Sequence, residues 1–359
     1  DETKAAEKVE YLLIRAIEKI VQNKQIIGIT LSGGLDSSLI VAICRKLYPR
    51  RKIYTYSCGF HGDDEFEYSR QVAELYSDKH EEIVLGKKDF IGSESIVPSL
   101  IKHKCAPLHP NETALAYAEL KARQDLCDIV LCGEGSDDIF GGYGHNLRMY
   151  ISYFGNSSGF FDYIINNYRY FSKEERSNIL QSQYCVDVEE ECNVFTELNA
   201  PLAVEDKMFY FIQRLHTRGL IERGLNALTY NGFVPGFPYI DDDLVDYVNS
   251  LPFDFKVRWK DGIIPDNYKE LSYVDISDMY DITKYLLKKV SEKYLPENII
   301  YRKKKGFPVP FEIWFKNDNT WDLDMQVFKT KDISWLSGWK KFMLINLDMF
   351  IKIFNVYKA

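Results

Sequence analysis

The 359-residue chain is predicted to fold as a doubly wound α/β protein, with a parallel sheet in its first part and a largely helical extension after it. Short apolar runs that are typical of buried strands alternate with segments of helical periodicity up to about residue 132. Two glycine-rich turns each follow one of these apolar runs directly. Beyond about residue 150 the strand signals fade and helical spacing dominates, so we place the change of architecture there.

The first part begins with an amphipathic helix. Residues 3–22 place Val9, Leu12, Leu13 and Ala16 at helical spacing ahead of the first strand. The strands are expected at about residues 26–31, 52–57, 80–85 and 128–132. The helices between them are expected at about residues 37–47, 65–76, 87–103 and 112–125. In such a sheet, ligands bind at the carboxyl ends of the strands, where both glycine-rich turns lie.

The second part has the pattern of helices with aromatic-rich faces, which at helical spacing are typical of a packed core. These helices are expected at residues 160–182, 205–230, 241–250 and 280–294. The polar, irregular stretch 252–278 is expected to be a loop. We therefore divide the chain into an α/β core over residues 1–150 and a helical extension over residues 151–359 that closes the site.

Composition and charge exclude several classes of partner. The net charge is −8 and the longest basic run, residues 302–305, is too short to follow a phosphate backbone, so no nucleic-acid partner is expected. No apolar stretch approaches the roughly 20 residues of a membrane span. The seven cysteines form no C-x-x-C pair, which is typical of reduced thiols in a cytoplasmic protein. Because the chain does not begin with Met, we expect it to be cut from a longer one or to have lost a processed segment.

Residues 31–38, Leu-Ser-Gly-Gly-Leu-Asp-Ser-Ser, form the more informative of the two turns. Two glycines allow a backbone to pass close to phosphates, while serine hydroxyls, backbone N–H groups and the start of a helix supply donors and positive charge. Asp36 lies where a magnesium ion that bridges phosphates needs a carboxylate ligand. The order is not that of a Walker A loop, and it matches enzymes that split ATP between its α- and β-phosphates. ATP and Mg²⁺ are therefore the expected cofactors.

Residues 133–143, Gly-Glu-Gly-Ser-Asp-Asp-Ile-Phe-Gly-Gly-Tyr, form the second turn and again follow a buried strand. Because the carboxyl ends of parallel strands meet at one edge of a sheet, Asp137 can supply a second magnesium contact that faces Asp36. Glu134 is a carboxylate placed to accept a proton where a nucleophile attacks. A solvated turn would explain the charges, but not the apolar strand before them.

The two loops together resemble the synthetase domain of asparagine synthetases, whose hallmarks are S-G-G-x-D-S-S and S-G-E-G-S-D-E-x-F-G-G-Y. Three further segments resemble motifs of the same family. Phe237–Asp241 is similar to its V-P-F-L-D, Lys284–Lys288 to its K-x-L-L-R, and Tyr301–Pro310 to its R-x-K-x-G-F-x-V-P. The resemblance covers nearly the whole chain, and it implies that the α/β part is a PP-loop ATP pyrophosphatase core of the HUP-like class.

The resemblance also implies which residues bind the nucleotide. The pyrophosphate would be cradled by the backbone and hydroxyls of Ser32, Gly33, Gly34, Ser37 and Ser38. Leu31 and Cys58 would lie beside the adenine, and Gly133 near the ribose or the adenylate. Asp36 and Asp137 would bind magnesium.

The implied reaction has two steps. A substrate carboxylate attacks the α-phosphate to give an acyl-adenylate and pyrophosphate, and nitrogen then displaces AMP to form an amide. Lys304 would neutralise charge on the departing pyrophosphate, and Glu134 would receive a proton from the attacking nitrogen. Such chemistry depends on positioning and charge neutralisation more than on covalent catalysis.

The chain departs from the family on the side of the acid and the nitrogen. No N-terminal glutaminase domain with a cysteine nucleophile is expected within this sequence, since its first cysteine is Cys44. Ammonia or another amine would then come from a removed domain, a separate subunit or elsewhere. The segment Lys104–Glu112 replaces an acidic D-E-P, and Val234–Gly236 replaces E-x-R. Possible new pocket residues are His103, His109 and Arg223.

We therefore expect an ATP-dependent, AMP-forming carbon–nitrogen ligase, similar to asparagine synthetase, that amidates a small-molecule or peptide carboxylate. Aspartate is one candidate substrate. The alternatives are a tailoring ligase that forms an amide or lactam on a peptide or small acid, and a nucleotide-binding partner subunit without turnover. Glu134 favours asparagine synthetase-like chemistry, because the related β-lactam synthetases carry Tyr at this loop position. The negative charge and the lack of paired cysteines disfavour a tRNA-thiolating enzyme.

Overall fold

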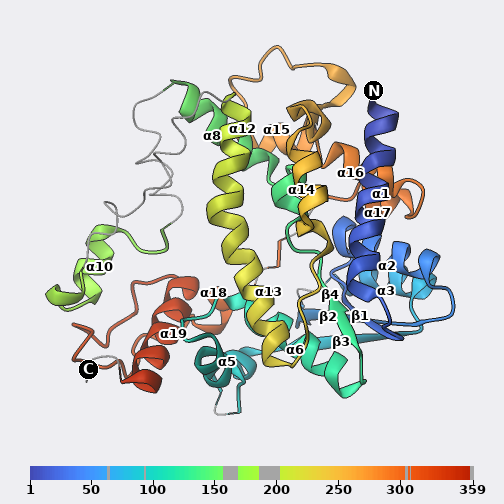
Figure 1. The fold of residues 1–359 in the computed structure, drawn as a ribbon. Helices are drawn as coiled ribbons and strands as arrows, with labels where there is room; N and C mark the ends of the chain where they lie inside the picture. Colours follow the sequence, from blue (N-terminus) through green and yellow to red (C-terminus); the bar gives the residue numbers. More distant parts are fainter. Residues whose placement is uncertain are drawn as a thin grey trace.

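A computed structural model describes residues 1–62, 65–92, 94–156, 169–185, 203–303, 306–307 and 309–355. Its centre is a four-stranded sheet in the order β3-β2-β1-β4 (Figure 1). All neighbouring strands are parallel. The strands are β1 (Ile26–Thr30), β2 (Lys52–Phe60), β3 (Lys79–Leu85) and β4 (Ile129–Leu131).

The order of the strands creates a switch point between β1 and β4. The chain moves from β1 outward through β2 to β3, and then returns to place β4 on the opposite side of β1. The loops that leave β1 and β4 therefore diverge, and a crevice opens between them at the carboxyl edge of the sheet. Both glycine-rich loops predicted to bind the nucleotide begin at this crevice.

Helices cover both faces of the sheet, as the predicted doubly wound fold requires. On one face, α1 (Glu2–Val21), α2 (Leu35–Leu47) and α3 (Phe66–Tyr76) share an apolar core with β1. On the other face, α6 (Pro110–Gln124) and α13 (Arg218–Tyr230) pack on β4 through side chains that include Ala118, Val130 and Leu228. The predicted fold class is confirmed.

One predicted helix is divided in two. The segment expected as a helix over residues 87–103 contains α4 (Lys87–Ile91) and α5 (Val97–Lys104). Gly92 ends α4 by donating its N–H to Lys88 O at 2.8 Å, and Pro98 lies in the first turn of α5, where a missing N–H costs nothing. Helical spacing alone does not show such a break, because the apolar positions continue through it.

The second half is largely helical, and several of its elements match expectation. The predicted helix 205–230 is α12 (Val204–Phe211), a π-helical turn at Ile212–Thr217, and α13 in succession, and the predicted helix 241–250 is α14 (Asp242–Asn249). Of the helix expected at 160–182, residues 160–168 lie outside the described residues, and the remainder contains α10 (Lys173–Ile179). Two further helices, α7 (Ser136–Phe140) and α8 (Gly144–Asn156), follow β4 and precede this region.

The stretch expected as a loop contains regular structure. Within residues 252–278 lie β5 (Val257–Trp259) and α15 (Tyr273–Met279). The predicted helix 280–294 begins instead with β6 (Asp281–Thr283), which pairs antiparallel with β5, and only then continues as α16 (Tyr285–Ser291). Three-residue strands carry too little periodicity to be recognised from sequence. No helix in the described ranges is both long and apolar enough to cross a membrane.

The C-terminal region adds α17 (Glu297–Ile300), α18 (Phe311–Trp314) and α19 (Gly338–Phe354), which the sequence pattern did not predict. An aromatic cluster holds α18 and α19 together. The rings of Phe311 and Phe342 stack with centroids 4.4 Å apart, and Phe90 from α4 meets both rings edge-on. Phe311 is fully buried, so this cluster attaches the last helix to the α/β part.

Replacing Phe311 by alanine should destabilise the fold by about 3 to 5 kcal/mol, because a buried aromatic ring is lost and leaves a cavity. Chemical denaturation measures the change. Ile313→Ala is the matched control on the same helix, since Ile313 is 74% exposed, and it should change the free energy of unfolding by no more than about 0.5 kcal/mol. Equal effects of the two substitutions would contradict the role given to the cluster.

Candidate active site

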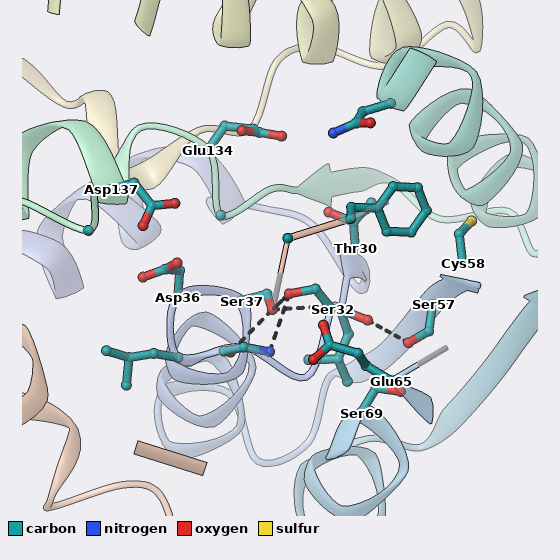
Figure 2. Close-up of a pocket in the computed structure, with 18 of the residues that line it drawn as sticks. Thr30, Ser32, Asp36, Ser37, Ser57, Cys58, Glu65, Ser69, Glu134 and Asp137 are labelled. Carbon is teal, nitrogen blue, oxygen red and sulfur yellow. Dashed lines mark hydrogen bonds between the residues drawn. The ribbon is translucent and has the colours of Figure 1, made fainter. Parts of the chain in front are cut away.

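A cavity of about 540 Å³ opens at the carboxyl edge of the sheet, in the crevice between β1 and β4. Figure 2 shows Glu134 and Asp137 on one side of it and Asp36, Ser37 and Ser32 on the other. Strand β2 and helices α3, α6, α13, α16 and α17 contribute further lining residues. The cavity is therefore formed by segments that are far apart in the sequence.

The loop after β1 is held in shape by its own hydroxyl groups. Ser32 N donates to Ser37 Oγ at 3.1 Å, and Gly34 N donates to Ser32 Oγ at 3.3 Å (Figure 2). Gly33 has a φ of +69°, and a Cβ there would lie 2.6 Å from Ser69 N, so glycine is required on both counts. Gly34 caps α2 without a side-chain acceptor, so the positive end of this 13-residue helix faces the cavity.

Two carboxylates from the two loops converge on one ammonium group. Lys284 Nζ lies 2.6 Å from Asp36 Oδ2 and 2.7 Å from Asp137 Oδ1. Ser136 adds a hydrogen bond from its hydroxyl to Asp36 Oδ1 at 2.7 Å. Burial by itself would lower the pKa of Lys284, but the two carboxylates outweigh it and raise the pKa above its ordinary value. Lys284 is therefore charged at neutral pH.

Gly142 allows this arrangement. A Cβ at residue 142 would overlap both Asp137 Oδ1 and Lys284 Cε. Any side chain there would displace the acid or the lysine, so the second glycine-rich loop is also required for steric reasons. Lys284 itself adopts a left-handed conformation with a φ of +53°, which is strained for a residue with a Cβ. Such strain persists where surrounding contacts hold it in place.

Most of the residues predicted from sequence do line this cavity. They are Leu31, Ser32, Gly34, Asp36, Ser37, Cys58, Gly133, Glu134 and Asp137. Gly33 and Ser38 belong to the same loop but do not line it, and the hydroxyl of Ser38 is buried without a partner in the described part of the chain. Lys304 lies outside the described residues, although its neighbours Arg302 and Gly306 line the cavity.

Several cavity residues were given no role in the sequence analysis. Lys284 and Lys288 occupy the two basic positions of the K-x-L-L-R-like segment, and that motif was the signal available for them. Arg302 forms an ion pair with Glu65, and its guanidinium lies 4.5 Å from the ring centroid of Tyr68. No motif indicates Glu65, because its partner is 237 residues away.

Lys288 differs from Lys284 in its electrostatics. Burial lowers the pKa of Lys288 to about 8, and the nearby charges of Lys284 and Lys260 act in the same direction. Asp36 opposes the shift only in part. An anion that approaches this wall in addition to Asp36 would therefore stabilise the protonated form of Lys288.

The predicted pocket residues on the acceptor side divide into two groups. His109 and Arg223 line the cavity, and Arg223 Nη1 lies 2.9 Å from His109 Nδ1. His103 is not a lining residue, since its Nδ1 pairs with Asn226 Oδ1 at 2.8 Å behind the wall. Burial lowers the pKa of His109 to about 3, and the charges of Arg223 and Lys104 add to the effect.

Comparison with known proteins identifies the family. Residues 8–346 match the family model described as Asparagine synthase. The chain belongs to this family. The predicted resemblance is thereby confirmed over almost the whole chain.

Relatives share modest identity with the chain. It is 24% identical over 343 residues to "Asparagine synthetase [glutamine-hydrolyzing] 1" of Bacillus subtilis. The matched region covers 89% of this chain and 52% of that protein. A "Probable asparagine synthetase [glutamine-hydrolyzing]" of Acanthamoeba polyphaga mimivirus is 24% identical over 83% of this chain and 42% of that protein. A putative asparagine synthetase of Methanocaldococcus jannaschii is 29% identical over a region that covers 42% of this chain and 29% of that protein. The chain thus spans about half of these relatives' length or less.

The neutral state of His109 makes the free energy of unfolding depend on pH. Between pH 3 and 6.5 the unfolded chain binds a proton at this position that the folded protein does not, so stability is lost as the pH falls through this window. From pH 7.5 to 5, the wild type should lose about 2 kcal/mol more than His109→Gln.

Denaturant titrations at the two pH values measure this difference. His61→Gln, which changes an exposed histidine, should lose stability in parallel with the wild type. If His109→Gln lost as much stability as the wild type between pH 7.5 and 5, the buried neutral histidine would not be the cause of that loss.

Proposed function

We propose that the chain is an ATP-dependent, AMP-forming synthetase that activates a substrate carboxylate and transfers nitrogen to it. The observation that carries the proposal is the pair of acids Asp36 and Asp137, which meet at Lys284 beside the loop 31–38. A phosphate-binding loop, two acids and a buried cation within one cavity suit a nucleotide that is cleaved there. Membership of the asparagine synthase family supports the same class of reaction.

The loop 31–38 would hold the departing pyrophosphate at the start of α2. Backbone N–H groups and the hydroxyls of Ser32 and Ser37 surround this end of the cavity. Leu31 and Cys58 would form the adenine wall, with Gly133 near the ribose. Burial raises the pKa of Cys58 to about 12, so its thiol stays protonated and serves as a wall rather than as a nucleophile.

The two acids also fit magnesium. Asp36 and Asp137 both reach Lys284 Nζ within 2.7 Å, so they are close enough to share one cation. In the described part of the chain, no three His, Cys, Asp or Glu side chains gather as a metal site. Mg²⁺ would thus take its remaining ligands from phosphates and water, as it usually does at nucleotides. Bound there, it would neutralise phosphate charge.

The two remaining roles are those of Glu134, which would accept a proton, and Lys304, which would balance negative charge. Glu134 follows β4 and lines the cavity, and its Cγ lies 3.9 Å from where a Cβ on Gly224 of α13 would be. It would accept the proton of the attacking nitrogen, whether ammonia or another amine. Lys304 keeps the role implied by its motif, as the cation that balances the pyrophosphate.

A tailoring ligase for another acid is the second candidate, and one observation favours it. Where the family has E-x-R, Gly236 packs directly on β4, with Cys132 N donating to Gly236 O at 2.8 Å. A Cβ on Gly236 would overlap Val130 O, so no side chain can project from this position. This segment therefore differs in construction from the family's E-x-R motif, which favours a substrate other than the family's.

Release of pyrophosphate from ATP and Mg²⁺, with a panel of carboxylic acids and with or without ammonium, tests the proposal. Acid-dependent release with formation of AMP is expected. Turnover of aspartate with ammonium would exclude the tailoring ligase. ATP binding without release for any acid would point instead to a partner subunit that does not turn over.

Asp36→Asn should lower acid-dependent pyrophosphate release by about 100-fold or more without unfolding the protein, because one of the two converging carboxylates is lost. Circular dichroism verifies the fold. Asp322→Asn is the control, since the side chain of Asp322 is 88% exposed, and it should leave the rate unchanged. Full activity of Asp36→Asn would contradict the assigned role.

Gly142→Ala should abolish the same activity, because the added methyl group displaces Asp137 and Lys284. Gly219→Ala is the matched control, since a Cβ at Gly219 meets no atom within 4 Å. The expected result is an inactive first variant and an active second one in the pyrophosphate assay. An active Gly142→Ala would show that the two acids and the lysine need not meet.

A further inference from the structure

Arg223 is a buried cation that faces the cavity without a counter-ion. It lies on α13, is 9% exposed and lines the cavity. Its Nη1 contacts the imidazole of His109, with 2.9 Å to Nδ1. Its Nε is buried and has no hydrogen-bond partner, and within the described residues no carboxylate lies within ion-pair distance of it.

His109 does not balance this charge. Asn111 N donates to His109 Nδ1 at 3.2 Å, so this nitrogen is an acceptor and carries no proton. Arg223 therefore donates to a neutral ring. An uncompensated guanidinium in a buried position costs stability, so its retention beside a cavity suggests that it serves a ligand.

Other cations of the cavity are paired differently. Lys284 is neutralised by Asp36 and Asp137, and Arg302 by Glu65. Lys288 also lines the cavity, but burial lowers its pKa to about 8, so it holds its charge less firmly than a guanidinium. These pairs lie at the end of the cavity where ATP would bind. Arg223 comes from α13 and has no such acid among the described residues, so an anion of the bound reactants would compensate it.

The Arg223 side chain is held in place from behind. His109 is the N-cap of α6, and its backbone N–H donates to Glu112 Oε2 at 3.4 Å. Glu112 is fully buried and also accepts from Lys104 at 2.8 Å and from Asn226, which is on α13. This network ties α6 to α13, so the His109–Arg223 pair is positioned before any ligand arrives.

We propose that Arg223 binds a second acidic group of the substrate, so that the enzyme activates one carboxyl of an acid that carries two and needs no free amino group. The inference rests on the proposed function and names its substrate class. Ala114, Leu115 and Leu220 line the same cavity and offer apolar surface for a short carbon chain.

We exclude a free amino group from the substrate because the described cavity wall has no carboxylate available to bind one. Asp36, Asp137 and Glu65 are already paired with cations. Glu134 is assigned to the proton of the attacking nitrogen. A free ammonium group requires an anion as its partner, and each carboxylate among the described lining residues already has a partner or an assigned role.

Pyrophosphate release with four acids tests the inference. Succinate and N-acetyl-L-aspartate carry two carboxylates without a free amine, butyrate carries one carboxylate, and L-aspartate carries two with an amine. The two amine-free dicarboxylates should be accepted at least as well as L-aspartate, and butyrate should be at least about 10-fold poorer in kcat/KM.

Arg223→Gln should raise the KM for the dicarboxylates about 10- to 100-fold, while the KM for ATP stays within about twofold. Arg223→Lys should recover part of the loss. Arg218→Gln is the matched control on the same helix, because Arg218 is 78% exposed, and it should behave as the wild type. Circular dichroism verifies that Arg223→Gln folds as the wild type does.

Equal use of butyrate and succinate, an unchanged KM in Arg223→Gln, or release with L-aspartate alone would each overturn the inference. Release with none of the acids would count against the proposed function instead. In that case, calorimetric binding of succinate in the presence of a non-hydrolysable ATP analogue decides the inference separately. Tighter binding to the wild type than to Arg223→Gln supports it, and equal or absent binding overturns it.

Discussion

The ion-pair cluster of Lys284 with Asp36 and Asp137 is the interaction on which the site depends. Asp36 lies in the first turn of α2, Asp137 on α7 and Lys284 directly before α16, so one ammonium group joins three distant segments. Without it, two carboxylates would face each other at close range in a partly buried place, which is unfavourable. Gly142 allows the contact, and a strained Lys284 backbone is kept for it.

The cavity is electrostatically asymmetric. Near α2, the cations Lys284 and Arg302 are balanced by acids of the protein, so a magnesium nucleotide bound as proposed would exchange existing pairs for new ones. Arg223, on α13, has only the neutral His109 as its hydrogen-bond partner among the described residues. Under the proposed function, the nucleotide would meet a largely compensated surface and the acid an uncompensated charge. This asymmetry would then separate where the two reactants bind.

Local sequence patterns predicted the parts of the structure that local physics decides. The strands and helices around β1, β2 and β3 appear where expected, since burial on a sheet or helix imposes its own period. The segment 87–103, predicted as one helix, is two helices, α4 and α5. The stretch 252–278, predicted as a loop, contains β5 and most of α15. Helix α19 was missed. It is held by Phe311 and Phe342, whose contact depends on tertiary packing.

The sequence by itself determined the two glycine-rich loops and their acids, because close approach of a backbone to phosphates and steric contact demand those residue types in a short span. It also indicated His109 and Arg223 as pocket candidates. Only the tertiary structure decided that Lys284 joins the two acids, that Glu65 pairs with Arg302, and that Arg223 has no counter-ion in the described part of the chain. Charge compensation acts between atoms a few ångströms apart, and which charges come that close is decided by packing rather than by order along the chain.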